Sequence, residues 1–242
     1  MEQFLSALPA TLIQGLIYAL ISLGVYITYS ILDFPDLGVD GTFPLGAAVT
    51  AVLLTKGVSP WLTLPIAMGV GALAGLFTGF IHVRLKVRDL LAGIITMTAL
   101  FSINLQIAGS NLTIERSTDT IFSSRAVLAL CGDMTLTGRK ILVSLVLVLA
   151  VKLGMDAYLR TKSGLLLRAV GDNASLVTTL AMDRGRMKIL GLAISNALVA
   201  LAGCIVCHEN RSFSATMGTG QLVYGLAAVI ISEVTFGKLF QN

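Results

Sequence analysis

The chain has 242 residues, of which 55% are hydrophobic and only 12% are charged, and its formal net charge is +4. Soluble domains carry about a quarter charged residues, and a chain of this size cannot cover several helices that are apolar on every side. The composition therefore excludes an ordinary soluble protein and indicates an integral membrane protein.

Six apolar runs are long enough to cross a bilayer as helices, since its core of about 30 Å requires roughly 20 residues. In chain order they are 8–29, 61–83, 90–109, 141–159, 187–207 and 221–240. The first run is expected to remain in the membrane, because residues 1–10 contain Glu2 and no basic residue and so do not form a signal peptide. We predict an all-α, polytopic transmembrane helical bundle that forms one domain over residues 1–242.

A shorter apolar run covers residues 43–55. At 1.5 Å per residue it would extend only about 20 Å, which is too short to span comfortably. Thr42 is a suitable N-cap, and Pro44 stands where the first helical turn tolerates proline. We therefore predict a re-entrant or half helix that begins inside the membrane, with its free N–H groups directed into a solute pathway.

Three aspartates, Asp33, Asp36 and Asp40, lie between the first span and this half helix, in the segment YSILDFPDLGVDGTFPLG (residues 29–46). No lysine or arginine stands among them. Two roles stay open. The carboxylates can cap helix ends, which we favour for Asp40, or they can meet the ammonium group of a solute, which suits Asp33 or Asp36.

Basic residues set the expected orientation, because short loops rich in lysine and arginine lie on the cytoplasmic side. Such residues gather in segments 84–88 and 160–188, and two predicted crossings separate these segments. Both segments are therefore expected in the cytoplasm, with the loop 110–140 outside. Bases confined to short loops are typical of orientation signals, so we do not expect nucleic-acid binding.

Glycines recur at every fourth position in the run 61–83, at Gly71, Gly75 and Gly79. They form one smooth stripe on a helix, and such a stripe lets a second helix approach closely. We predict a packing role for this stripe rather than contact with a ligand.

Polar residues inside the spans usually face the interior of the bundle or a cavity. Thr98, Ser102 and Gln106 share one helix face, since they are spaced by four residues. Each polar residue can equally hydrogen-bond to a neighbouring helix. With the three aspartates and Thr42, the candidates for the pathway are Thr98, Ser102, Asn104, Gln106 and Asn196, and further polar residues in the spans are Gln14, Ser22, Thr96 and Ser195.

The segment SGLLLRAVGDNASLVTTLAMDRGRMK, residues 163–188, predicts a short amphipathic helix that ends near Gly185. Asp172 or Asn173 can cap it, and Leu176 and Leu180 then lie on one face. Because bases flank it, the helix is expected on the cytoplasmic surface. It is either a connector lying on the lipid or a docking element for a soluble partner.

Two motifs resemble those of a known transporter family. The segment DLGVDG (residues 36–41) is similar to the "DLSVGS" signature of sugar permeases. A second set resembles the coupling-helix region of ATP-binding-cassette (ABC) importer permeases for branched-chain amino acids, ribose and related solutes: Gly164, Arg168, Ala169, Gly171, Asp172, Asn173 and, in the next span, Gly203. The resemblance covers roughly residues 8–240. Asp33 replaces the asparagine of an "NF" element found in amino-acid permeases, which leaves the solute open.

The resemblance implies a multi-pass permease subunit of the cell membrane that pairs with a second copy or a close paralogue. It also implies an ABC ATPase subunit, which uses the ATP, and an extracytoplasmic solute-binding protein. Contact with the ATPase would involve Arg168, Gly171, Asp172, Asn173, Leu176, Thr179 and Leu180. The family usually has one or two further spans, so we expect a shortened or truncated member.

We expect neither a catalytic nor a metal site, and no cofactor. The chain has no Walker-type phosphate loop, and three aspartates within one loop do not form a facing pair. Cys204, Cys207 and His208 match a C-x-x-C-H haem motif, but the cysteines continue an apolar helix, as buried thiols commonly do. A disulfide from Cys131 to either thiol stays open.

The family resemblance favours an amino acid as the solute, including those with large apolar side chains. The predicted pathway agrees, because it offers few hydrogen-bonding groups and sugars need more. Sugars and nucleosides remain alternatives, as does a stand-alone channel or secondary carrier that needs no partner.

Overall fold

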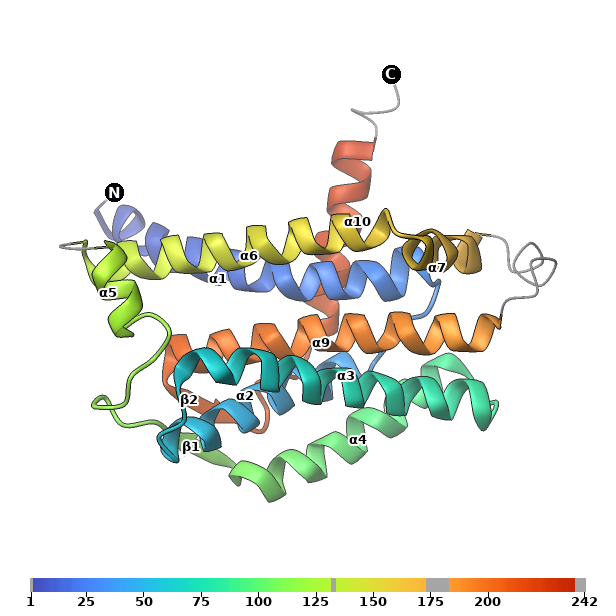
Figure 1. Cartoon of the computed structure of the whole chain (residues 1–242), viewed down its shortest axis with the longest axis horizontal. Helices are drawn as coiled ribbons and strands as arrows, with labels where there is room; N and C mark the ends of the chain where they lie inside the picture. Colours follow the sequence, from blue (N-terminus) through green and yellow to red (C-terminus); the bar gives the residue numbers. More distant parts are fainter. Residues whose placement is uncertain (1, 132–133, 173–182, 238–242) are drawn as a thin grey trace.

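The computed structural model describes residues 2–131, 134–172 and 183–237, and this part is helical apart from one small sheet (Figure 1). The helices are α1 (Glu2–Tyr26), the π-helix η1 (Ile27–Ile31), α2 (Val39–Thr55), α3 (Pro60–Arg84), α4 (Asp89–Ala108), α5 (Arg125–Cys131), α6 (Leu136–Leu159), α7 (Lys162–Asp172), α9 (Arg184–Asn210) and α10 (Gln221–Gly237). The strands β1 (Asn111–Thr113) and β2 (Ser212–Ser214) pair antiparallel, with Leu112 opposite Phe213.

The predicted membrane bundle is confirmed. Within the described residues, five helices are long and apolar enough to cross a bilayer: Ala7–Ile31, Pro60–Arg84, Asp89–Ala108, Leu136–Leu159 and Arg184–Asn210. They correspond to five of the six predicted spans. In Figure 1 these helices run roughly along one direction, with α9 between α1 and α6 on one side and α3 on the other.

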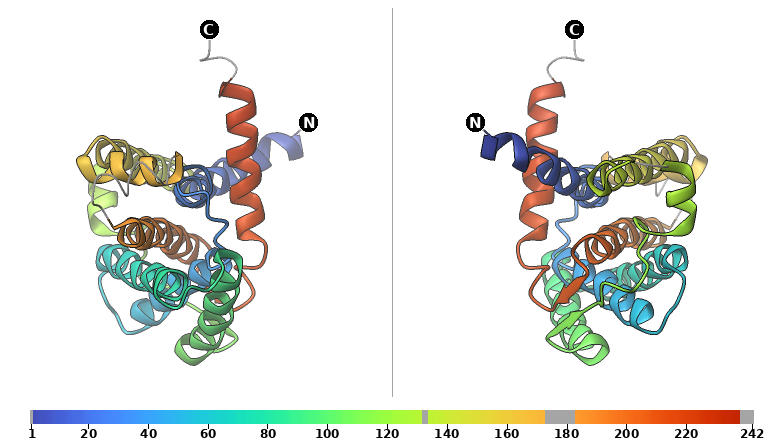
Figure 2. Two further views of the ribbon diagram at one scale, coloured as in Figure 1. Left: turned by 90° about the vertical axis from the view of Figure 1, so that its right-hand side faces the viewer. Right: turned by 90° about the vertical axis from the view of Figure 1, so that its left-hand side faces the viewer.

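The sixth predicted span differs from expectation. Over its described 17 residues, α10 crosses the direction of the other helices instead of lying beside them (Figures 1 and 2). Its first turn is bound to Asp40 of α2 inside the bundle, so the helix starts there and projects outward across α1. Apolar length alone does not specify such an angle.

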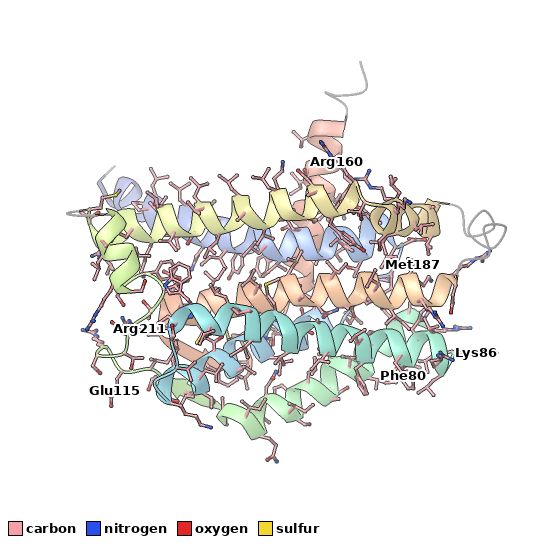
Figure 3. All side chains as sticks on the ribbon, in the orientation of Figure 1. Phe80, Lys86, Glu115, Arg160, Met187 and Arg211 are labelled. Atoms are coloured by element: carbon pink, nitrogen blue, oxygen red, sulfur yellow. The ribbon has the colours of Figure 1, made fainter. Side chains whose placement is uncertain are left out.

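The basic segments predict that the loops around Lys86 and Met187 lie at one end of the bundle and the external loop at the other, and the structure has this arrangement. Figure 3 places Lys86, between α3 and α4, and Met187, near the start of α9, at the same end of the molecule. Glu115 and Arg211 lie at the opposite end, where β1 and β2 pair. Lys86 and Met187, from the segments 84–88 and 160–188, therefore lie on one side of the bundle, in agreement with the expected orientation.

Glycines set the close packing of α3 on α9. A Cβ at Gly75 would collide with the carbonyl oxygen of Leu192, and one at Gly79 would lie 2.9 Å from the Cα of Ile189. Gly71 meets α9 in the same way, one turn earlier in α3. The predicted packing role of this stripe is confirmed.

Helix α2 packs on another side of α9, again through small residues. A Cβ at Gly46 would collide with the carbonyl oxygen of Ala200, and one at Gly203 would collide with that of Phe43. At 17 residues α2 is shorter than the spanning helices, as the half-helix prediction requires. It begins at Val39, four residues before the predicted start of the apolar run.

The connection from α1 to α2 consists of η1 and an irregular segment. Asp33 adopts a left-handed backbone conformation with φ of 51°, which is uncommon for a residue other than glycine. The buried side chains of Ile31 and Leu32 share an apolar cluster with Leu167 and Val170 of α7. Helix α7 therefore contacts the point at which the chain leaves η1.

Candidate functional site

A buried polar network joins the start of α2 to the middle of α9. Asp36 is fully buried, and its Oδ1 accepts a hydrogen bond from the backbone N–H of Gly38 at 2.8 Å. Its Oδ2 accepts from Nδ2 of Asn196, also at 2.8 Å. The Oδ1 of Asn196 accepts from the hydroxyl of Thr42 at 2.7 Å. One amide side chain of α9 thus holds both the carboxylate before α2 and the first turn of α2.

The expectation that Thr42 caps α2 is wrong. The helix starts at Val39 with Gly38 in the N-cap position, and Thr42 lies inside the first turn, where its hydroxyl donates to the carbonyl of Gly38 at 3.0 Å. The backbone N–H groups of Gly41 and Thr42 also donate to this carbonyl, at 3.0 and 2.9 Å. The N–H groups of Val39 and Asp40 donate to the carbonyls of Asp36 at 3.5 Å and Leu37 at 3.3 Å. The first N–H groups of α2 are therefore not free to point into a pathway.

Asp40 has a capping role, as expected, but it caps a distant helix. Its carboxylate oxygens accept hydrogen bonds from the backbone N–H groups of Gly220 at 3.0 Å and Leu222 at 2.8 Å, at the start of α10. Asp33, by contrast, is exposed. The structure therefore separates the three aspartates into one buried network member, one helix cap and one exposed residue.

The polar residues of α4 do not all join this network. Asn104 is buried, and its Nδ2 donates to the carbonyl of Gly41 at 3.1 Å. Thr98, Ser102 and Gln106 share one face, as predicted, but all three side chains are exposed. Thr98 and Asp40 line a cavity of about 280 Å³ between α2, α4 and the segment before α10.

Cys204 and Cys207 are free, fully buried thiols of α9. The hydroxyl of Thr63 lies 3.6 Å from Sγ of Cys204 and 2.8 Å from Nε2 of His208. Thiols enclosed in this way are not accessible to a haem group. Over the described ranges, no three His, Cys, Asp or Glu side chains come together as a metal site. The side chain of Cys131 lies outside the described residues.

Two of the predicted ATPase-coupling residues can be placed with their surroundings. Arg168 is exposed on α7, and Gly171 lies in the last turn of α7, where a Cβ would collide with the carbonyl oxygen of Ile31. Asp172 is the last residue of α7. Asn173, Leu176, Thr179 and Leu180 lie outside the described residues, so the predicted amphipathic helix stays a prediction.

Comparison with known proteins decides the family. A family model described as "Branched-chain amino acid transport system / permease component" matches residues 8–240. The chain belongs to this permease family. It is a multi-pass membrane permease of an ABC transporter and not an enzyme, which confirms these predictions. Membership implies, in general terms, an ATPase and a solute-binding protein as partners.

Relatives of the permease transport different solutes according to their names. This chain is 38% identical to the "Tyrosine transport system permease protein" of Clostridioides difficile (strain R20291), over 97% of this chain and 75% of that protein. The "Probable branched-chain amino acid transport permease protein LivH" of Methanocaldococcus jannaschii is 28% identical, over 86% of this chain and 68% of the relative. The "Ribose import permease protein RbsC" of Haemophilus influenzae is 28% identical, over 90% of this chain and 66% of the relative. No solved structure matches.

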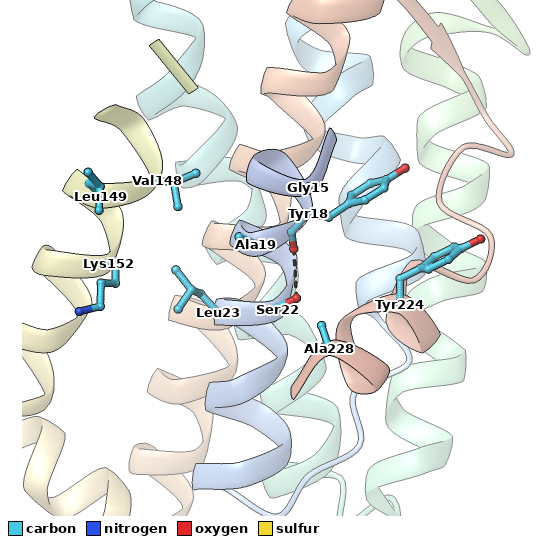
Figure 4. Close-up of a pocket in the computed structure, with 10 residues that line it drawn as sticks. All are labelled: Gly15, Tyr18, Ala19, Ser22, Leu23, Val148, Leu149, Lys152, Tyr224 and Ala228. Atoms are coloured by element: carbon cyan, nitrogen blue, oxygen red, sulfur yellow. Dashed lines mark hydrogen bonds between the residues drawn. The ribbon is translucent and has the colours of Figure 1, made fainter. Parts of the chain in front are cut away.

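The permease has a cavity of about 580 Å³ between α1, α6 and α10 (Figure 4). Tyr18 of α1 and Tyr224 of α10 stack beside it, with ring centroids 6.1 Å apart and an interplanar angle of 4°. An adjoining cavity of about 170 Å³ is lined by Ser22, Leu23, Tyr26, Ala228, Val229, Ser232 and Glu233.

Sequence reasoning identified Ser22 but missed the other polar residues of these two cavities. Two signals were present. Tyr18, Ser22 and Tyr26 are spaced by four residues and so share a helix face. Glu233 is an acidic residue inside the apolar run 221–240, and an ionisable residue in such a run is a functional candidate by default.

Proposed function

We propose that this permease imports an amino acid with a large apolar or aromatic side chain, and that L-tyrosine is the first solute to test. The observation that carries the proposal is the 38% identity, over 97% of this chain, to a permease named for tyrosine transport. The relative named for ribose import is less similar, at 28%. The family assignment favours an ATP-driven importer over a stand-alone channel or carrier.

The distribution of polar groups supports an amino acid over a sugar. The polar side chains of the buried network hydrogen-bond to one another: Asn196 donates to Asp36 and accepts from Thr42. The cavity beside Tyr18 and Tyr224 is lined mainly by apolar and aromatic side chains. A sugar carries hydroxyl groups around its whole ring and needs several hydrogen-bonding partners, whereas the polar groups of L-tyrosine are confined to its ammonium and carboxylate groups and one phenolic hydroxyl, so it needs fewer.

The partners follow from the proposed importer. A cytoplasmic ATPase would dock on α7 and the segment 173–182, and the solute-binding protein would meet the opposite end, near β1 and β2. A second permease copy or a close paralogue would complete the pathway, for which Thr98, Ser102 and Gln106 offer an exposed polar face on α4. The junction of Asp36, Thr42 and Asn196 would then join the half helix α2 to α9 as the bundle alternates its access.

Reconstitution tests the proposal. Vesicles containing the permease, its ATPase and its binding protein are assayed for ATP-dependent uptake of L-tyrosine, L-leucine and D-ribose. The expected order places L-tyrosine first. Preferred uptake of ribose would overturn the solute assignment, and a lack of ATP-dependent uptake of every probe would overturn the assignment as an importer of these solutes.

The docking role of the segment 173–182 has its own test. Leu180→Asp places a charge on the proposed apolar docking face, so ATP hydrolysis should become uncoupled from uptake in the same vesicles. Leu153→Asn, at an exposed position of α6, is a control for added polarity away from α7. Unchanged coupling in the Leu180 variant would contradict the docking assignment.

A further inference from the structure

We propose that the cavity between α2, α4 and the segment before α10 binds the imported amino acid, with the ammonium group of the solute at Asp40. This Asp40 cavity has a volume of about 280 Å³, and the residues of its lining that matter here are Asp40, Pro44, Met97, Thr98, Phe101 and Thr219. The inference rests on the proposed import of an amino acid. It names the group that recognises the solute, on the α4 face to which the pathway is assigned.

The carboxylate and the α4 side of the cavity lie close enough for one amino acid to contact both. Gly41, which follows Asp40, packs directly on α4, where a Cβ added to it would lie 3.0 Å from the Cα of Met97. Thr98 and Phe101 follow Met97 within about one helical turn, so the three side chains are neighbours on α4. A solute in the cavity therefore meets Asp40 on α2 and this turn of α4 at the same time.

The segment before α10 supplies a further wall of the cavity. Gly218 packs so closely on α2 that a Cβ there would collide with the carbonyl oxygen of Asp40. The next residue, Thr219, is exposed and lines the cavity. Within the described part of the chain its hydroxyl makes no hydrogen bond. A hydroxyl can both donate and accept, so Thr219 is suited to donate to the carboxylate of the solute.

The carboxylate of Asp40 is only partly occupied by its capping role. It accepts from the N–H groups of Gly220 at 3.0 Å and Leu222 at 2.8 Å, whereas a carboxylate offers about four lone-pair sites. The ion pairs between described side chains do not include Asp40. Because Asp40 is half-buried and lines the cavity, an ammonium group with its three N–H donors complements the remaining lone pairs.

The depth of the cavity favours a charged partner for Asp40. Thr98 stands halfway along α4, a helix of 20 residues that is long and apolar enough to cross the bilayer. A carboxylate at such a depth is costly unless it faces a cavity or pairs with a cation. Asp40 lies in the first turn of α2 and binds the first turn of α10, so two helices begin here. Broken helices that meet near the midplane form the solute sites of many transporters.

The remaining lining suits the side chain of an apolar or aromatic amino acid. Met97 and Phe101 present exposed apolar groups, and aromatic rings attract one another at centroid distances of 4.5–7 Å. Sites for small molecules typically measure about 300–1,000 Å³, with an apolar lining and a few polar groups. The Asp40 cavity lies near the lower end of this range, as expected for a solute no larger than one amino acid.

The sequence gives independent support, because Asp40 stands where the sugar permeases have glycine. Aligned without gaps, the segment DLGVDG (residues 36–41) and the "DLSVGS" signature agree at Asp36, Leu37 and Val39, whereas Asp40 replaces the glycine. The shared Asp36 belongs to the buried network that holds α2 to α9. Asp40 is therefore the additional acidic group of this chain, and a sugar has no ammonium group that would pair with it.

Photo-cross-linking locates the site directly. Vesicles containing the permease, its ATPase and its binding protein are supplied with ATP and 4-azido-L-phenylalanine and irradiated, and the labelled peptides are identified by mass spectrometry. We expect label on residues 97–101 or 215–219, reduced at least tenfold by excess L-tyrosine. Label confined to other helices, or no label although the probe is imported, would overturn the site.

Asp40→Asn tests the role of the charge, because it keeps one oxygen that can cap α10. The permease and its ATPase are labelled without the binding protein, so that the permease alone selects between 4-azido-L-phenylalanine and 3-(4-azidophenyl)propionate, which lacks the ammonium group. The wild type should prefer the amino acid at least tenfold, and Asp40→Asn should abolish most of this preference. Asp36→Asn, which removes the neighbouring carboxylate, and Asp119→Asn, in an exposed external loop, are the controls and should keep the preference.

The outcomes separate the site from the proposed function. An unchanged preference in Asp40→Asn, or an equal loss of label from both probes, would leave Asp40 with its capping role only and overturn the recognition of the ammonium group. Label on the wild type decides the location of the site even if the variant does not assemble. A wild-type transporter that imports no amino acid would overturn the proposed function itself.

Discussion

Asp36 and Asn196 are 160 positions apart in the chain, yet Nδ2 of Asn196 donates to Oδ2 of Asp36 at 2.8 Å in the interior of the bundle. The same amide accepts from Thr42 through its oxygen. Since both ends of the Asn196 side chain are engaged by residues at the start of α2, this contact fixes the half helix against α9.

Asp36→Asn should reduce stability without altering the order of solute preference. The new amide can still cap Gly38 through its oxygen, but its NH₂ group would face the NH₂ group of Asn196. Loss of one buried hydrogen bond with unsatisfied partners costs about 1–3 kcal/mol. Thermal inactivation in detergent and uptake of the solute panel measure the two effects, and Asp119→Asn is the exposed control. A changed solute order would contradict the structural role of Asp36.

Asp40→Ala should loosen the start of α10, because it removes the acceptor for the N–H groups of Gly220 and Leu222. Loss of a helix cap costs about 1 kcal/mol, within a range of 0.5–2. Asp40→Asn retains one acceptor and should show a smaller effect. Hydrogen exchange of the amides of residues 220–224 provides the measurement, and equal protection in the wild type and Asp40→Ala would disprove the cap.

Sequence reasoning predicted features that depend on local pattern. The lengths of five of the six apolar runs predicted the spanning helices, and the spacing of Gly71, Gly75 and Gly79 predicted the close contact between helices. The half helix was also predictable, since an apolar run of 13 residues, 43–55, cannot span a bilayer. Each of these features needs only the period and length of the run.

Features that depend on distant partners could not be predicted in the same way. Threonine is a residue type that commonly caps helices, so Thr42 was a reasonable choice. In the structure, however, the carboxylate of Asp36 accepts from the N–H of Gly38, and α2 already starts at Val39. The capping role of Asp40 was foreseen, whereas its target lies 180 and 182 positions away. That contact fixes the start of α10 inside the bundle, so the cavity between α1, α6 and α10 could not be predicted from the sequence.

Gly75→Ala should destabilise the bundle, because its methyl group would collide with the carbonyl oxygen of Leu192 in α9. Overpacking of a close contact typically costs about 1–3 kcal/mol. Gly69→Ala is the matched control in the same helix, since a Cβ there meets nothing within 4 Å. In a helix interior, alanine is favoured over glycine by about 1 kcal/mol, so the control should be as stable as the wild type or more so. Similar melting temperatures for the two variants would contradict the close packing of α3 on α9.

Gly171→Ala should impair the transfer of movement from the cytoplasmic side to the start of α2. Gly171 of α7 lies directly against the carbonyl of Ile31, at the end of η1, and the chain continues from there to Asp36. A methyl group would separate α7 from η1, so the cluster that contains Leu32, Leu167 and Val170 would be disturbed. A movement of α7 would then be transmitted less completely to the contact between α2 and α9 that Asp36, Thr42 and Asn196 form.

Reconstituted vesicles can test this coupling by comparing ATP hydrolysis with solute uptake in the same preparation. We expect Gly171→Ala to keep hydrolysis within about twofold of the wild type while uptake falls about tenfold, which corresponds to about 1.4 kcal/mol of coupling free energy. Gly154→Ala of α6 is the control, because a Cβ at that position meets nothing within 4 Å. If uptake per ATP hydrolysed is the same in both variants, contact between α7 and η1 is not the route by which the cytoplasmic segment acts on α2.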